Sequence, residues 1–238
     1  MSRVKLITVV LALGAGLGAL AQTTKQPKVG PGPNEPDWVV ILRERFGLSM
    51  FDDLLNPVRT TPEATPGLFR KAGPGPVRFT PVIALGLPTR NRGGWYAAVS
   101  GRDAAPKKVP LWSYVHKNTT EDLRRGQNLP PRLDPDSTTG FDPGDDPFGF
   151  WVSNDGLDDG GVYSQPAFVA RFNKRLAKQP YKAMIYPYRD KASGRIIPNS
   201  YLIGWEYSDN DDFQDIVCRV ENVILLEQHS ASKPATAR

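Results

Sequence analysis

Short apolar runs separated by turn residues dominate this chain from residue 77 onward, and they limit what it can fold into. Each run is three to nine residues long, and Gly, Pro, Asn or Asp stand between most of them. This spacing is typical of antiparallel β-sandwiches and jelly rolls. We therefore predict a mostly β protein of that class, with strands near 77–85, 94–99, 109–115, 148–152, 162–164, 182–187, 201–206, 216–220 and 223–226.

Helical periodicity is clear in only one place. The stretch 37–46 reads as a short amphipathic helix, with Asp37 as its N-cap and Gly47 as its stop. A second and weaker helical pattern covers 166–178, and the proline-rich stretch 57–76 predicts an irregular connection.

The N-terminal residues follow the pattern of an export signal. Arg3 and Lys5 precede an apolar stretch, and Ala19-Leu20-Ala21 is a small-residue cleavage site. We predict a signal peptide at 1–21, with an uncleaved anchor as the alternative, and then a polar linker at 22–36. A β-sandwich domain at 37–228 and a disordered tail at 229–238 would follow.

This organisation indicates an exported protein, located outside the cell, at its surface or in the periplasm. No lipidation cysteine follows the signal and no apolar tail ends the sequence, so we expect no stable membrane anchor. Two of the basic residues behind the net charge of +5 lie in the signal. The remaining charge is small, which disfavours a nucleic-acid partner. Cys218 is the single cysteine, and its place in an apolar strand predicts a buried, inert thiol.

Five carboxylates crowd into the ten residues 206–215, between two predicted strands and without a Lys or Arg among them. Clustered carboxylates repel one another unless a cation lies between them. Asp and Glu side chains are the ligands that Ca²⁺ prefers. We therefore predict a Ca²⁺ site with Glu206, Asp211, Asp212 and Asp215 as first candidates and Asp209 and Asn210 as second. A further loop could approach it with Asp155, Asp158 and Asp159.

Other kinds of metal site fit the acidic loop less well. The EF-hand pattern fails because a start at Asp209 places Val220 where the final Glu should stand. Zinc and copper are disfavoured because His116 and His229 are the only histidines and neither neighbours Cys218. A solvated acidic turn with no ion remains the simplest alternative.

The segment YLIGWEYSDNDDFQDIVCRVENV, residues 201–223, resembles the end of the DUF4114 family of bacterial extracellular domains. Trp205-Glu206 matches the first part of the family's pattern, and 211–213 with 215–217 matches the second. Together with FGFWV, GVYS and KAMIYP upstream, the resemblance covers residues 145–225. It implies a β-sandwich in an exported or surface protein, with acidic residues holding Ca²⁺. Tyr207 and Gln214 depart from the family's usual Asp and Asn, which would weaken the site.

Three classes of function fit these observations. We expect a non-catalytic module for surface adhesion or glycan recognition, with Tyr186 and Tyr188 as a stacking surface and a glycan or cell-surface component as partner. A purely structural secreted or matrix domain is the alternative. A glycoside hydrolase using paired carboxylates is a second alternative, disfavoured because any acidic loop meets that description.

Overall fold

The computed structural model describes residues 24–25, 27–32, 35–59, 67–98, 104–115, 130–157 and 160–226. The predicted signal peptide and disordered tail therefore lie outside the described residues. The predicted strands are present, and the described chain is mostly β, as expected. Its helical elements are α1 (Trp38–Ile41), the π-helical η1 (Leu42–Phe46), α3 (Pro166–Phe172) and the 3-10 helix η2 (Lys174–Leu176).

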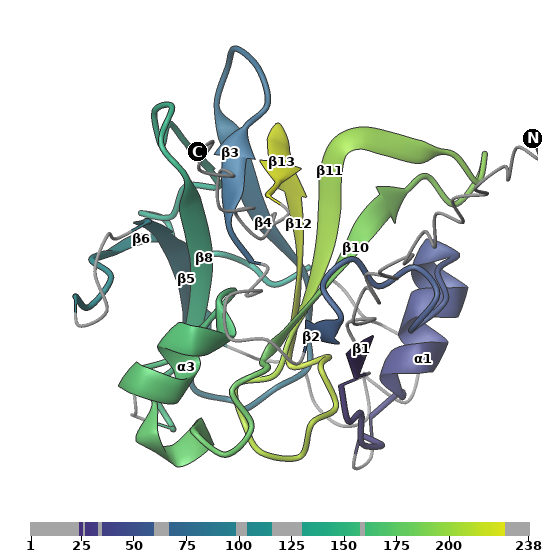
Figure 1. Cartoon of the computed structure of the whole chain (residues 1–238), viewed down its shortest axis with the longest axis horizontal. Helices are drawn as coiled ribbons and strands as arrows, with labels where there is room; N and C mark the ends of the chain where they lie inside the picture. Colours follow the sequence, from purple (N-terminus) through teal and green to yellow (C-terminus); the bar gives the residue numbers. More distant parts are fainter. Residues whose placement is uncertain are drawn as a thin grey trace, which may run out of the picture.

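The strands form two antiparallel sheets and one short pair (Figure 1). The five-stranded sheet has the order β10 (Ala183–Arg189), β11 (Ile196–Trp205), β12 (Ile216–Glu221), β4 (Val77–Ala84) and β7 (Gly140–Phe141). The six-stranded sheet has the order β13 (Val223–Leu225), β3 (Phe69–Lys71), β8 (Phe148–Asn154), β5 (Arg90–Ala97) and β6 (Lys108–Val115), with β9 (Val162–Tyr163) paired to β8. The short pair joins β1 (Thr24–Lys25) to β2 (Val58–Arg59).

A single apolar core lies between the two sheets. Phe79 of the five-stranded sheet contacts Phe150 and Trp112 of the other, with ring centroids 4.5 and 5.4 Å apart. Cys218 belongs to the same core as Trp151 and Trp205, which confirms its predicted burial. Two sheets joined through one core confirm the predicted antiparallel β-sandwich. The jelly-roll form stays a prediction.

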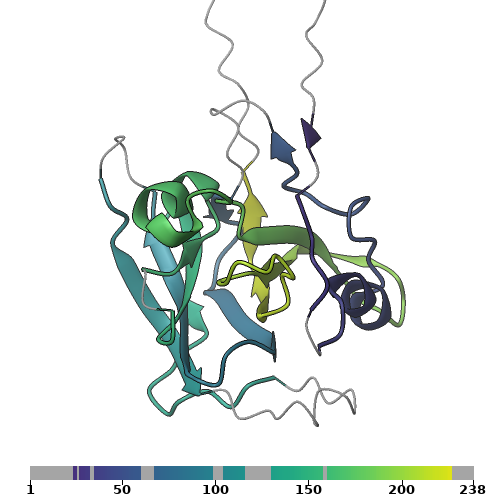
Figure 2. The ribbon, with the colours of Figure 1, turned by 90° about the horizontal axis from the view of Figure 1, so that it is seen from below.

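The outer face of the five-stranded sheet carries a second core, which the N-terminal helix covers (Figure 2). Trp38 packs edge-on against Tyr186 and donates a hydrogen bond from Nε1 to the Tyr186 hydroxyl, 3.2 Å away. The helical stretch ends at Gly47, whose φ of 64° is readily adopted only by glycine. The predicted helix is thus present, and it forms a third layer on the sheet.

Strand alternation assigns successive residues of β11 and β12 to different cores. Ile203 and Cys218 face the inter-sheet core, whereas Leu202 and Val217 face the helix. Both faces are covered along 202–205 and 216–218, and these parts of the two strands carry no polar side chain. The acidic loop 206–215 joins β11 to β12 and therefore begins and ends where both cores meet.

Helix α3 and β9 close one end of the inter-sheet core, since Phe168 contacts Tyr96 and Tyr163 with ring centroids 5.5 and 5.8 Å apart. Among the described residues, no helix combines the length and apolar character needed to cross a membrane.

Candidate metal centre

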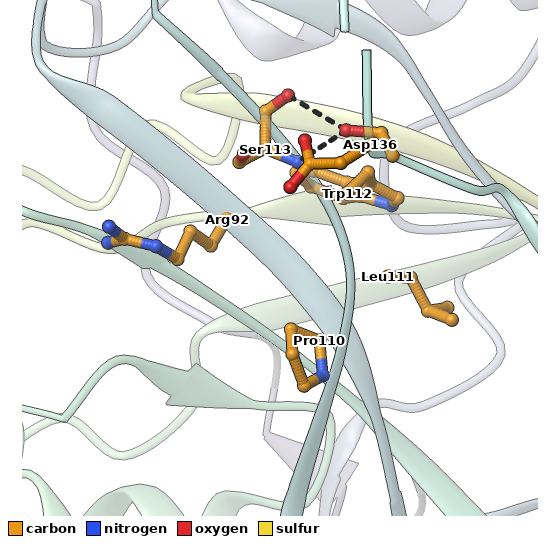
Figure 3. A pocket seen from close by; sticks show the side chains of 7 residues that line it. Arg92, Pro110, Leu111, Trp112, Ser113 and Asp136 are labelled. Carbon is orange, nitrogen blue, oxygen red and sulfur yellow. Dashed lines mark hydrogen bonds between the residues drawn. The ribbon is translucent and has the colours of Figure 1, made fainter. Parts of the chain in front are cut away.

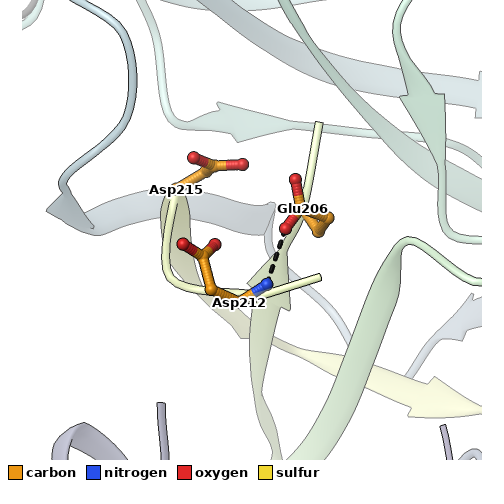
Figure 4. A group of neighbouring side chains, drawn as sticks. All are labelled: Glu206, Asp212 and Asp215. Atoms are coloured by element: carbon orange, nitrogen blue, oxygen red, sulfur yellow. Dashed lines mark hydrogen bonds between the residues drawn. The ribbon is translucent and has the colours of Figure 1, made fainter. Parts of the chain in front are cut away.

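Three carboxylates of the acidic loop converge on one point. Glu206, Asp212 and Asp215 each offer an oxygen that lies no more than 4.8 Å from the other two, and Figure 4 shows the three groups pointing toward one another. All three side chains are buried, with relative exposures of 0%, 1% and 6%. Oxygens bound to one Ca²⁺ at 2.3–2.6 Å can be at most about 5 Å apart. The group is compact enough to hold a metal ion.

Backbone and amide donors hold these carboxylates in place. The backbone N–H groups of Ser208 and Asp212 donate to the two oxygens of Glu206, at 2.6 and 2.7 Å. Tyr207 N–H donates to Asp215 Oδ2 at 3.0 Å. Asn210 Nδ2 donates to Asp212 Oδ2 at 2.6 Å. These neutral donors orient the oxygens but leave the summed negative charge in place.

Three buried oxygens of the acidic loop have no hydrogen-bond partner among the described residues. They are Oδ2 of Asp211, Oδ1 of Asp212 and Oε1 of Gln214, and all three side chains are almost fully buried. An unsatisfied buried carboxylate oxygen costs free energy, and such groups are rare unless water or an ion fills the gap. The unpaired Asp212 oxygen belongs to the converging group, so the loop has capacity for a cation that the described part of the chain does not supply.

The protonation equilibria of the cluster reflect the same crowding. Burial, reinforced by the Glu206 carboxylate, raises the pKa of Asp212 to about 8. Burial, followed by Glu206 and Asp212, also raises the pKa of Asp215 well above its usual range. The ion pairs found among the described residues include none of these three carboxylates. Without a cation, the fold therefore favours the protonated forms of Asp212 and Asp215.

The backbone around Asp212 is held in an unusual conformation. Asp211 and Phe213 have φ values of 62° and 59°, in the left-handed region that residues other than glycine rarely adopt. Such conformations persist where the surroundings enforce them. Here the Phe213 ring is buried in the helix-covered core, 6.1 Å from the Tyr181 ring. The core thus turns Asp212 toward its neighbours.

Asp211 was a first-rank ligand candidate, but the structure gives it another role. Lys182 is buried, and its Nζ lies 3.0 Å from Asp211 Oδ1 and 2.9 Å from the Ser208 carbonyl oxygen. Asp211 is thus paired with a cation and lies outside the converging group. Lys182 therefore offsets part of the negative charge of the loop. Because it lies outside the loop in the sequence, the spacing of residues within the loop does not reveal this contact.

The second-rank candidates lie at the rim of the loop. Asp209 and Asn210 are exposed, and Asn210 supports the cluster as a hydrogen-bond donor to Asp212. Asp155 forms an ion pair with Arg92, and the converging group does not include it. Asp158 and Asp159 lie outside the described residues.

Contrary to the prediction, Tyr186 and Tyr188 do not form an exposed stacking surface. Tyr186 is fully buried beneath the helix, and its hydroxyl donates to the Met50 carbonyl oxygen at 2.9 Å. Tyr188 is half-buried, with Phe46 at its edge and the Arg219 guanidinium 5.3 Å above its ring. The reason is that α1 and η1 cover this face of the sheet.

Two further residues belong to the neighbourhood of the cluster. Gln214 stands where the DUF4114 family usually has Asn, and we expected it to weaken the metal site. It is buried and donates from Nε2 to Glu35 Oε2 at 3.2 Å. Burial raises the pKa of Glu35 to about 7, opposed by the Gln214 hydrogen bond and reinforced by Glu206. Glu35 lies in the segment expected to be a solvated linker, so no local signal identified it.

A separate pocket of about 250 Å³ lies beside β6 on the six-stranded sheet (Figure 3). It shares no lining residue with the acidic cluster. The lining residues are Arg92, Pro110, Leu111, Trp112, Ser113, Asp136 and Ser137.

The fold and the site together define an antiparallel β-sandwich with a helix-covered outer face and a buried carboxylate cluster at the β11–β12 connection. Comparison of the chain with protein-family models, curated proteins and solved structures found no match. The resemblance to DUF4114 thus rests on the sequence motifs quoted above.

Proposed function

We propose that this protein is an exported, non-catalytic β-sandwich module whose 206–215 loop binds a divalent cation, Ca²⁺ before others, and that the cation stabilises the fold. The observation that carries the proposal is the buried, converging group of Glu206, Asp212 and Asp215 with an unpaired Asp212 oxygen. Carboxylate oxygens without nitrogen or sulfur ligands favour a hard cation such as Ca²⁺ over zinc or copper.

A structural role for the cation is favoured over a catalytic one. Glycoside hydrolases need two carboxyl groups that flank a sugar in an accessible cleft. Here all three carboxylates are buried, and none of them lines the pocket beside β6. A polysaccharide would have no access to them without local opening of the loop.

The burial of Tyr186 also bears on the wider role of the protein. Recognition of a glycan by Tyr186 and Tyr188 loses its main support, because Tyr186 lies in the helix-covered core. We therefore favour the purely structural secreted or matrix module over an adhesive one.

Binding of a cation should increase the thermal stability of the protein. Thermal unfolding of the chain should shift upward on addition of Ca²⁺ after treatment with EDTA. At a Ca²⁺ concentration a hundredfold above Kd the stabilisation is about 2.7 kcal/mol. For a domain of this size that corresponds to a rise in Tm of about 5–10 °C.

Asp212→Asn should abolish this shift, while its unfolding temperature without Ca²⁺ stays equal to or above that of the wild type, because a neutral amide replaces a carboxyl group whose charged form burial disfavours. Asp209→Asn, in the same loop but exposed, should retain the shift. Unfolding temperatures that do not respond to millimolar Ca²⁺ would count against the site.

A further inference from the structure

Residues 27–32 and Glu35 form an N-terminal segment that lies against the acidic loop rather than extending into solvent. Gly30 N–H donates to the Asp211 carbonyl oxygen at 2.7 Å, one residue before the ligand candidate Asp212. A Cβ atom at Gly30 would overlap the Asn210 carbonyl oxygen, so this close approach requires glycine. Two backbones in such contact indicate that the segment and the loop adopt their conformations together.

Side chains reinforce the same contact. Gln214 Nε2 donates to Glu35 Oε2, and the carboxylate of Glu35 lies close enough to Glu206 to interact with it electrostatically. Lys28 Nζ lies 3.9 Å from Asp211 Oδ2, with its side chain largely exposed. The segment thus brings a further carboxylate to the outside of the cluster.

The charge of Glu35 has opposite effects in the empty and the loaded site. Without a cation, ionised Glu35 would add a negative charge beside the carboxyl groups of the cluster, and like charges at short range repel. With a cation among them, the same carboxylate is attracted inward. The unpaired Oε1 of buried Gln214 offers a further neutral oxygen on this side of the cluster.

Resting on the cation site proposed above, we propose that the site is shared between the loop and the N-terminal segment. Glu35, held by Gln214, is its outer carboxylate, and a bound cation fastens residues 27–32 and Glu35 to the β-sandwich. By thermodynamic linkage, the docked segment raises cation affinity by the same factor by which the cation favours docking. The cation would thereby hold in place the segment that leads into the N-terminal helix.

Limited proteolysis of the full chain tests this arrangement. Trypsin can cut after Lys28 only when the segment leaves the loop, because the backbone of Gly30 is hydrogen-bonded there. We expect the initial rate of appearance of the fragment that begins at Val29 to fall about tenfold in Ca²⁺ relative to EDTA, a factor typical of such coupling.

Glu35→Gln should weaken Ca²⁺ binding by a similar, about tenfold, factor in calorimetric titration and should remove the protection of Lys28. Its thermal shift at saturating Ca²⁺ should persist. Glu44→Gln, at an exposed helix position, is the matched control and should behave as the wild type. Gly30→Ala changes no carboxylate, yet it should also weaken binding and expose Lys28, because its methyl group displaces the segment.

The outcomes separate the two proposals. Equal Ca²⁺ affinity in the wild type and Glu35→Gln, with cleavage after Lys28 insensitive to Ca²⁺, would overturn the shared site and leave the cation site intact. No Ca²⁺ binding by the wild type would overturn both. Protection of Lys28 that persists in Glu35→Gln would also overturn the role assigned to this residue.

Discussion

Lys182 is the basic residue that makes part of the acidic loop compatible with burial. It stands immediately before β10, and the antiparallel pairing of β10 with β11 brings it to the end of β11 where the loop begins. Its ammonium group neutralises Asp211 and satisfies the Ser208 carbonyl oxygen. A cation and an anion 29 residues apart thus form one buried, hydrogen-bonded pair.

Lys182→Met should destabilise the domain by about 3–5 kcal/mol, because it leaves the buried Asp211 carboxylate with only the exposed ammonium group of Lys28, 3.9 Å away. Chemical denaturation followed by tryptophan fluorescence would measure the loss. Adding Asp211→Asn should restore a large part of it, since the unpaired charge is then gone. Lys178→Met, at an exposed position, is the control. A double variant no more stable than Lys182→Met would contradict the pairing.

At the scale of elements, the N-terminal helix matters as a layer of the fold. Trp38 and Ile41 face the sheet, whereas Val39 faces solvent, as an amphipathic helix requires. The helix covers the face that carries Tyr186, which is why an aromatic residue beside polar turns is not a surface feature here. The second core forms where this helical stretch and residues 48–54 pack on the sheet.

Trp38→Ala should cost about 3–5 kcal/mol of unfolding free energy, because it leaves a cavity against Tyr186 and removes a buried hydrogen bond. Val39→Ala, one residue away and 41% exposed, should change the same quantity by less than about 0.5 kcal/mol. Urea denaturation of both variants provides the comparison. Similar losses in the two would show that the helix does not pack as a covering layer.

At the scale of the whole molecule, stability should depend on pH in a manner that the cation controls. In the cation-free fold the pKa of Asp212 is about 8, above its ordinary value of 3.8, and the pKa of Asp215 is also raised. Between these values the folded state binds more protons than the unfolded state. The unfolding free energy therefore decreases as pH rises from about 4 towards 8.

Denaturant unfolding in EDTA should accordingly show a more stable domain at pH 5 than at pH 8. Asp212→Asn should reduce this dependence, and saturating Ca²⁺ should reduce it as well, because the cation favours the ionised carboxylates. A cation-free stability that is constant over this range, or that rises with pH, would contradict the protonation assigned to the cluster.

Local patterns in the sequence determined the strands, the helix that ends at Gly47, and the loop that carries the acidic group. Strand alternation and turn residues act over a few neighbours, so they can be recognised without the fold. The β-sandwich class followed from their number and spacing. Glu206, Asp212 and Asp215 were recognisable as candidates because they are close in sequence and share one connection between strands.

Only the tertiary structure decided which carboxylates converge, which one pairs with Lys182, and which aromatic rings the helix buries. It also placed Glu35 beside the cluster, although 171 to 180 residues separate it from the other three carboxylates along the chain. Charge and burial depend on distances in space, and contacts between segments remote in sequence leave no local period or motif. For that reason the loop could be predicted from its residues, whereas the shape of the site required the fold.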